Sequence, residues 1–74
     1  MRIITEDRNY DIPYDNSILY VEKDNFYDDV KYDVRITTNF DNILLKSFKT
    51  KEEAQELIRD IRHTYMRAED VYMI

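Results

Sequence analysis

One stretch of the chain, residues 22–33, combines residue types that could bind a partner. It places the adjacent aromatic residues Phe26 and Tyr27 among five carboxylates, and its candidate residues are Glu22, Asp24, Phe26, Tyr27, Asp28, Asp29 and Asp33. Exposed aromatic residues surrounded by charge are typical of the energetic centres of protein interfaces. The carboxylates could also imitate phosphates and attract a nucleic-acid-binding protein. The alternative is that Phe26 and Tyr27 cover the core while the acids are simply solvated.

The same stretch does not have the pattern of a metal site. The acids Asp24, Asp28 and Asp29 lack the alternating aspartates, the glycine and the terminal glutamate of a calcium-binding loop. We therefore expect no metal and no cofactor.

The histidine, serine and cysteine content of the chain does not indicate a catalytic site. His63 is the one histidine, cysteine is absent, and neither Ser17 nor Ser47 has glycine neighbours. A nucleophile needs an adjacent base. Paired carboxylates need a cleft, which we do not expect in a short chain without glycine. The sequence therefore predicts a solvated helix position for His63 and a protein that is not an enzyme.

Length and composition predict a single domain over residues 1–74. The chain is close to the lower size limit for independent folding, so either a monomer or a homodimer is expected. The absence of cysteine fits a bacterial cytoplasm, and residues 1–7 are too acidic for a signal peptide. No apolar run approaches the ~18 residues that a membrane span requires. We expect no contact with a membrane.

The formal net charge of −5 belongs entirely to the first half of the chain. Residues 1–33 contain nine acids and four bases, whereas residues 34–74 contain seven of each. Direct binding to nucleic acid is disfavoured, because that affinity comes mainly from cations that neutralise phosphates. A basic protein surface is the better electrostatic match.

Residues 51–68 are predicted to form one amphipathic helix. Thr50 and Glu53 have the spacing of a capping box at its start. The apolar positions recur with helical spacing and form one stripe, made of Ala54, Leu57, Ile58, Ile61, Tyr65 and Ala68. A helix of this length is marginal alone in water, so the stripe must be buried against other elements.

Short segments with strand character fill the first 48 positions. They are residues 1–5, 10–14, 17–22, 30–37 and 43–48. A polar loop is expected at 23–29 and a hairpin loop at 38–42, where an asparagine, Asn39 or Asn42, could supply a left-handed conformation. These segments predict an α+β fold, with a small antiparallel sheet of about four to five strands covered on one face by the C-terminal helix.

The segment 30–37 has the clearest alternation of apolar and polar residues. We expect one set to face the helix, namely Val30, Tyr32, Val34 and Ile36. The tail Val71–Ile74 is too apolar for a free end. It either extends the helix or packs as a short arm, and it could also mediate self-association.

Both ends of the chain resemble a family of short uncharacterised proteins found in prophages and conjugative elements of Gram-positive bacteria. Members open with a Met-Arg-Ile-Ile-like strand followed by Asp-Ile-Pro-Tyr, which match Met1–Ile4 and Asp11–Tyr14. They close with a helix carrying Glu-Glu-Ala and Leu-x-x-Ile-Arg, which looks like Glu52–Ala54 and Leu57–Arg62. The middle is unmatched, and Arg8-Asn9 stands where members usually have a glycine.

The resemblance implies an origin in a mobile element. Small acidic proteins of such origin are often inhibitors of host machinery, including anti-CRISPR proteins, and this step is an analogy. We therefore predict a non-catalytic protein-binding module that inhibits host defence by docking residues 22–33 on a basic, nucleic-acid-binding partner. The alternative prediction is a small self-associating structural or regulatory protein.

Overall fold

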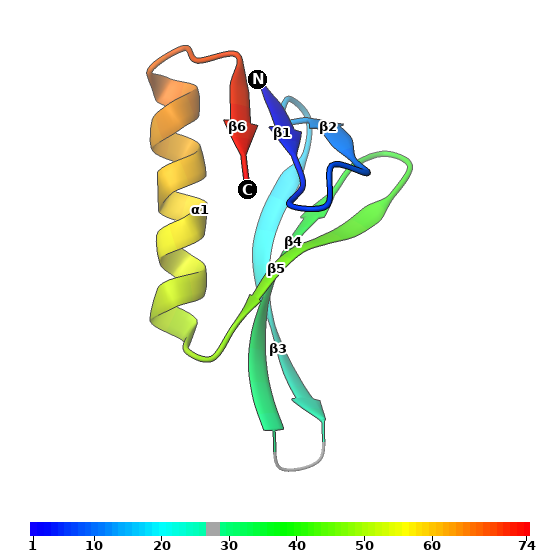
Figure 1. The fold of residues 1–74 in the computed structure, drawn as a ribbon, viewed down its shortest axis with the longest axis vertical. Coiled ribbons are helices and arrows are strands. Elements are labelled where there is room, and N and C mark those ends of the chain that lie inside the picture. Colours follow the sequence, from blue (N-terminus) through cyan, green and yellow to red (C-terminus); the bar gives the residue numbers. More distant parts are fainter. Residues whose placement is uncertain (27–28) are drawn as a thin grey trace.

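The computed structural model describes residues 1–26 and 29–74. Of Phe26, only the backbone is described. In these ranges six strands and one helix make up the fold (Figure 1). In chain order they are β1 (Arg2–Ile4), β2 (Asp11–Pro13), β3 (Ile18–Phe26), β4 (Asp29–Thr37), β5 (Asn42–Phe48), α1 (Lys51–Met66) and β6 (Val71–Met73). The predicted α+β fold, with a C-terminal helix packed against strands, is confirmed.

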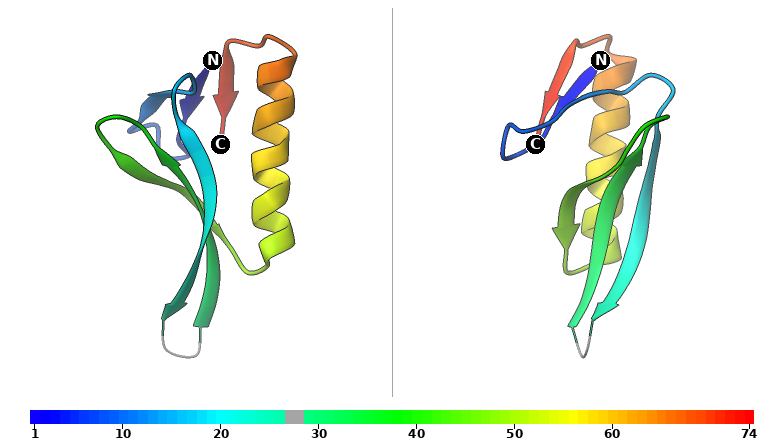
Figure 2. Two further views of the ribbon diagram at one scale, coloured as in Figure 1. Left: turned by 180° about the vertical axis from the view of Figure 1, so that it is seen from behind. Right: turned by 90° about the vertical axis from the view of Figure 1, so that its right-hand side faces the viewer.

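The strands form two three-stranded sheets where one sheet was expected. The larger sheet has the order β3-β4-β5 and is antiparallel throughout. The smaller sheet has the order β2-β1-β6, in which β1 pairs antiparallel with β2 and parallel with β6. The apolar tail is therefore a strand, in agreement with the short-arm alternative. Figure 2 shows the small sheet beside one end of the larger one.

The helix begins as predicted and ends two residues early. The Thr50 hydroxyl accepts a hydrogen bond from the Glu53 backbone N–H at 3.2 Å and donates to Glu53 Oε1 at 2.9 Å. The last helical residue is Met66, because Ala68 takes the left-handed conformation with φ of 57° and turns the chain toward β6. Over the described residues no helix is long and apolar enough to cross a membrane.

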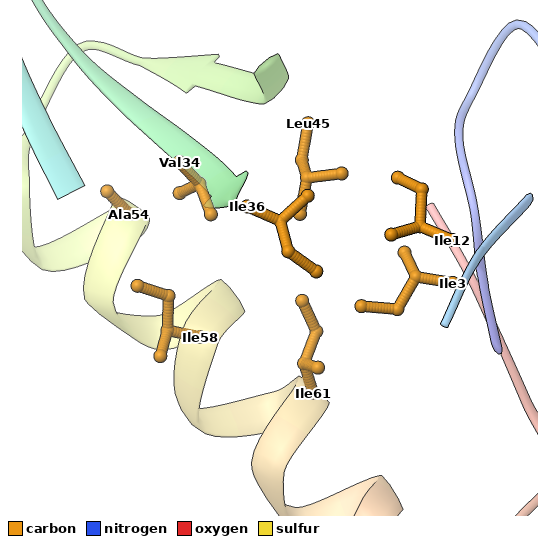
Figure 3. Close-up of a cluster of buried hydrophobic side chains, with 8 residues drawn as sticks. All are labelled: Ile3, Ile12, Val34, Ile36, Leu45, Ala54, Ile58 and Ile61. Carbon is orange, nitrogen blue, oxygen red and sulfur yellow. The ribbon is translucent and has the colours of Figure 1, made fainter. Parts of the chain in front are cut away.

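One hydrophobic core joins the helix to both sheets (Figure 3). The small sheet contributes Ile3 and Ile12 to it. The remaining buried apolar side chains come from β4, β5 and α1, and they are Val34, Ile36, Leu45, Ala54, Ile58 and Ile61. Three residues of the predicted helix stripe, Ala54, Ile58 and Ile61, are therefore buried and Leu57 packs against them, whereas Tyr65 and Ala68 are exposed.

Strand β4 alternates as expected, but β5 needs an irregularity to do so. Val34 and Ile36 are fully buried, whereas Val30, which lies far from the core, is 39% exposed.

Strand β5 contains one extra residue relative to β4. Tyr32 pairs with Phe48, and Ile36 pairs with Ile43, so four residues of β5 lie opposite three residues of β4 between these pairs. This bulge places Ile43 and Phe48 on one face despite their odd spacing.

The turn between β1 and β2 dispenses with glycine. Arg8 takes a left-handed conformation with φ of 65°. The Asp7 carboxylate accepts hydrogen bonds from the Thr5 hydroxyl at 2.6 Å and from the Asn9 N–H at 3.0 Å, and both lower the pKa of Asp7. Asn16 also has a positive φ, whereas the left-handed conformation expected in loop 38–42 is not found.

Strand β6 is tied to the helix by a side-chain hydrogen bond. The Tyr72 hydroxyl donates to Asp60 Oδ2 at 2.5 Å. Burial of the ring, followed by this hydrogen bond and the negative charge of Asp60, raises the pKa of Tyr72 to about 12. The small sheet and the helix are thus linked through a neutral phenol.

This link predicts a loss of stability at high pH. The folded protein holds the Tyr72 proton more tightly than the unfolded chain, so the stabilisation is complete below pH ~10 and is lost as the pH rises through about 12. In urea denaturation between about pH 9 and about pH 12, Tyr72→Phe should show a shallower alkaline decline in midpoint than the parent. Tyr10→Phe, at a half-exposed ring, is the control. Equal declines in parent and Tyr72→Phe would contradict this role.

Candidate functional site

The stretch predicted to be the docking surface is a β-hairpin. Lys23–Phe26 continue β3 and Asp29 begins β4, and the ladder runs without interruption to the pair Phe26↔Asp29. The prediction of a polar loop is therefore wrong for residues 23–26 and 29. Asp and Asn have low strand propensity, but the ladder that contains the core residue Val34, paired with Val21, continues past them. Of the predicted residues, Tyr27, Asp28 and the Phe26 side chain lie outside the described residues.

We call residues 22–26 and 29–33 of this hairpin the arm. Figures 1 and 2 show that it projects past the N-terminal end of α1, away from the small sheet. Residues 22–25 and 29–31 are all exposed to solvent. The arm therefore offers both of its faces at this end of the molecule.

The ladder collects four of the predicted carboxylates, Glu22, Asp24, Asp29 and Asp33, on one face. Glu22 pairs with Asp33, and Asp24 pairs with Lys31. Directly opposed residues of antiparallel strands share a face, and successive residues alternate. Asp29 therefore lies on the same face as these two pairs. Val34 and Ile36 lie on the opposite face, which packs against α1.

Glu22 is held by neighbouring polar groups. Its Oε2 lies 3.1 Å from Arg35 Nε, at an angle that gives an ion pair without a hydrogen bond. Arg35 Nη1 donates to Asn42 Oδ1 at 3.1 Å, and Asn42 Nδ2 donates to the Tyr20 hydroxyl at 2.6 Å. This network crosses all three strands of the larger sheet. Part of the charge of Glu22 is thus neutralised within the chain.

Asp33 is the clearest departure from the predicted site. Its side chain is buried, with the residue 6% exposed, and its Oδ1 accepts a hydrogen bond from the Ser47 hydroxyl at 2.6 Å. A buried carboxylate needs such a partner because desolvation otherwise opposes folding. Asp33 therefore stabilises the β4–β5 pair and is not available for docking.

Two carboxylates of the arm are exposed and unpaired within the described ranges. Neither Asp24 nor Asp29 forms an ion pair there. Lys31, opposite Asp24, is the cation of the arm on the same face. Among the described residues, the exposed acids of the predicted site are thus Glu22, Asp24 and Asp29.

The described residues do not assemble a cluster of metal-binding side chains. Residues 1–26 and 29–74 contain no group of three histidine, cysteine or acidic side chains placed to hold a metal ion. His63 is exposed on the polar face of α1, as expected. No protein-family model, curated protein or solved structure matches the chain.

Phe40 is an exposed residue that the sequence reasoning passed over. It lies in the loop between β4 and β5 and is 92% exposed, more than any other large apolar side chain in the described residues. A bulky aromatic residue in a polar hairpin loop, Thr38-Asn39-Phe40-Asp41, is the signal that could have identified it.

The Asp33–Ser47 hydrogen bond leads to a stability prediction. Ser47→Ala should lower the free energy of unfolding by about 1–2 kcal/mol, since it removes a donor to a buried carboxylate while leaving some access to water. Chemical denaturation measures this change, with Gln55→Ala on the exposed helix face as the control. Equal stability of parent and Ser47→Ala would show that the hydroxyl does not support Asp33.

Proposed function

We propose that this protein is a non-catalytic binding module that docks through its arm on a basic surface of another protein. The observation that carries the proposal is the projection of the arm beyond the core, with two exposed carboxylates, Asp24 and Asp29, that form no ion pair with any described residue. An extended hairpin of this kind can reach into a groove or lie along a partner surface.

The outer residues of the arm do not contribute buried side chains to the hydrophobic core. None of the described side chains at 23–25 and 29–31 is buried, so these positions add little hydrophobic stabilisation. A two-stranded hairpin is at best marginally stable in water without a core beneath it. Burial against a partner would supply the missing apolar contact.

The charge of the molecule supports a basic partner. The net charge is −5, and the arm presents carboxylates on the face that α1 leaves open. Complementary charge speeds association and disfavours partners of like sign. A row of carboxylates can occupy the site that a protein uses for phosphates, so the proposed partner is a nucleic-acid-binding protein.

A biological setting is proposed from the resemblance to mobile-element proteins. Small acidic proteins of that origin are often inhibitors of host machinery. We extend the proposal accordingly to an inhibitor of host defence that resembles anti-CRISPR proteins in its mode of action. The supports for this extension are the terminal sequence motifs and the acidic composition.

The arm proposal predicts a binding defect on charge reversal. Tagged protein should recover a basic nucleic-acid-binding protein from bacterial lysate at low salt, identified by mass spectrometry, and lose it as salt rises. With that purified partner, Asp24→Lys/Asp29→Lys should weaken affinity roughly tenfold or more in titration calorimetry and flatten the salt dependence. Nucleic acid should compete with the parent protein for the partner.

The matched control is Glu52→Lys/Glu69→Lys, which makes the same change in net charge on and after the helix. It should bind nearly as well as the parent. Equal weakening by both double variants would assign the effect to overall charge and contradict a specific arm. Unchanged affinity of the arm variant would contradict docking through Asp24 and Asp29.

Self-association is the second candidate, and the open edge of β3 favours it. β3 is an outer strand of the larger sheet, and Ile18 at its start is 65% exposed. Edge strands can pair with a second copy unless charges protect them. Sedimentation velocity over a range of concentrations should then show a dimer that Ile18→Lys weakens. A monomer at every concentration would contradict this candidate.

A further inference from the structure

A groove lies at the end of the larger sheet opposite to the arm. It runs between the segment around β2 and the loop that joins β4 to β5, which lie side by side in Figures 1 and 2. Its volume is about 460 Å³. We call it the Phe40 groove, and the lining residues that matter here are Tyr10, Asp11, Pro13, Asp15, Phe40 and Asp41.

Aromatic surface is available on both sides of this groove. Phe40 is 92% exposed on the loop side, and Tyr10 is 49% exposed on the opposite side. Pro13, the last residue of β2, is also exposed and lines the groove. Aromatic rings contribute large contact areas to interfaces, and an almost fully exposed phenylalanine gains from any partner that covers it. The groove thus offers apolar contact without rearrangement of the core.

The loop that carries Phe40 is held in shape before any partner binds. The Thr38 hydroxyl accepts hydrogen bonds from the backbone N–H groups of Phe40 at 3.2 Å and Asp41 at 3.1 Å. The Thr38 N–H donates to the Asp41 carbonyl at 2.8 Å. Prior ordering reduces the entropy lost on binding. Phe40 is therefore presented on a structured tip.

The negative charge of the groove lining favours a positively charged ligand. The lining contains three aspartates and neither lysine nor arginine. Asp11 is paired with Arg2, whose Nε lies 3.0 Å from its carboxylate, and Asp15 lies 3.8 Å from the Met1 amino group. The Asp41 carboxylate has no ion-pair or side-chain hydrogen-bond partner within the described ranges, and it directly follows Phe40. Asp41 therefore supplies, at the residue next to Phe40, a negative charge with which a bound cation could pair.

We infer that the Phe40 groove binds an arginine side chain presented by an extended apolar peptide segment of the partner. The planar guanidinium can stack on an aromatic face and pair with a carboxylate at once, which a lysine ammonium does less well. Apolar residues flanking the arginine would cover Tyr10 and Pro13. The expectation of a basic partner rests on the proposed protein-binding function. The groove is nevertheless a separate surface from the arm.

The test is an NMR titration of the whole protein with an acetylated Leu-Pro-Arg-Leu amide peptide. We expect the backbone amide signals of Tyr10, Phe40 and Asp41 to shift with a single affinity. The same peptide with citrulline in place of arginine keeps the shape and removes the charge, and it should bind roughly tenfold more weakly. Shifts confined to the arm, or equal binding of the citrulline peptide, would overturn the inference.

Variants separate the groove from the arm. Phe40→Ala should weaken peptide binding roughly tenfold, and Asp41→Asn should weaken it by a smaller factor. Neither should unfold the protein, because Phe40 is 92% exposed and the loop is held by Thr38. Met66→Ala, at a side chain that is 79% exposed on the helix, is the control and should bind normally.

The arm variant Asp24→Lys/Asp29→Lys should also bind the peptide normally. Loss of partner binding by this variant with peptide binding intact would support both proposals. Normal peptide binding by Phe40→Ala would overturn the groove and leave the arm proposal standing. Failure of the arm test would leave the groove result unaffected.

Discussion

The mutual burial of three isoleucines is the contact on which the rest of this small structure depends. Ile3 comes from the small sheet, Ile36 from the larger sheet and Ile61 from the helix, and each is 0% exposed. Neither sheet nor helix could bury its apolar face alone in a chain of 74 residues. Because one cluster serves all three parts, the two sheets and the helix stabilise one another.

This shared core leaves both ends of the larger sheet free for other uses. One end extends as the arm, where residues 22–25 and 29–31 are exposed. The other end carries the loop at 38–41 with Phe40 at its tip. Polar side-chain contacts organise the sheet face that the helix does not cover, through Glu22 and Arg35 near the arm and Asn42 near the loop. Binding at either end would therefore not require the core to change.

Local patterns did not indicate which acids of the stretch 22–33 are exposed and which are held by other side chains. The stretch 22–33 was recognised by its acids and aromatics, but those acids have different roles in the structure. Asp33 supports the sheet through Ser47, Glu22 is paired with Arg35, and Asp24 remains exposed. Sequence spacing cannot make this distinction, since the partners Arg35 and Ser47 are brought there by strand pairing. Exposure of Phe40 is likewise a property of the assembled surface.

Elements with local signals can be predicted from the amino-acid sequence alone. The helix start at Thr50, its buried stripe and the alternation in β4 follow from capping and from hydrophobic periodicity. The formation of β6 by the apolar tail could not be predicted locally, because β6 pairs with β1 at the opposite end of the chain. The bulge in β5 likewise depends on pairing with β4. The β3–β4 ladder continues through Asn25 and Asp29, although the propensities of these residues favour a loop. Those outcomes depend on long-range hydrogen bonds and shared burial, which no short window of sequence contains.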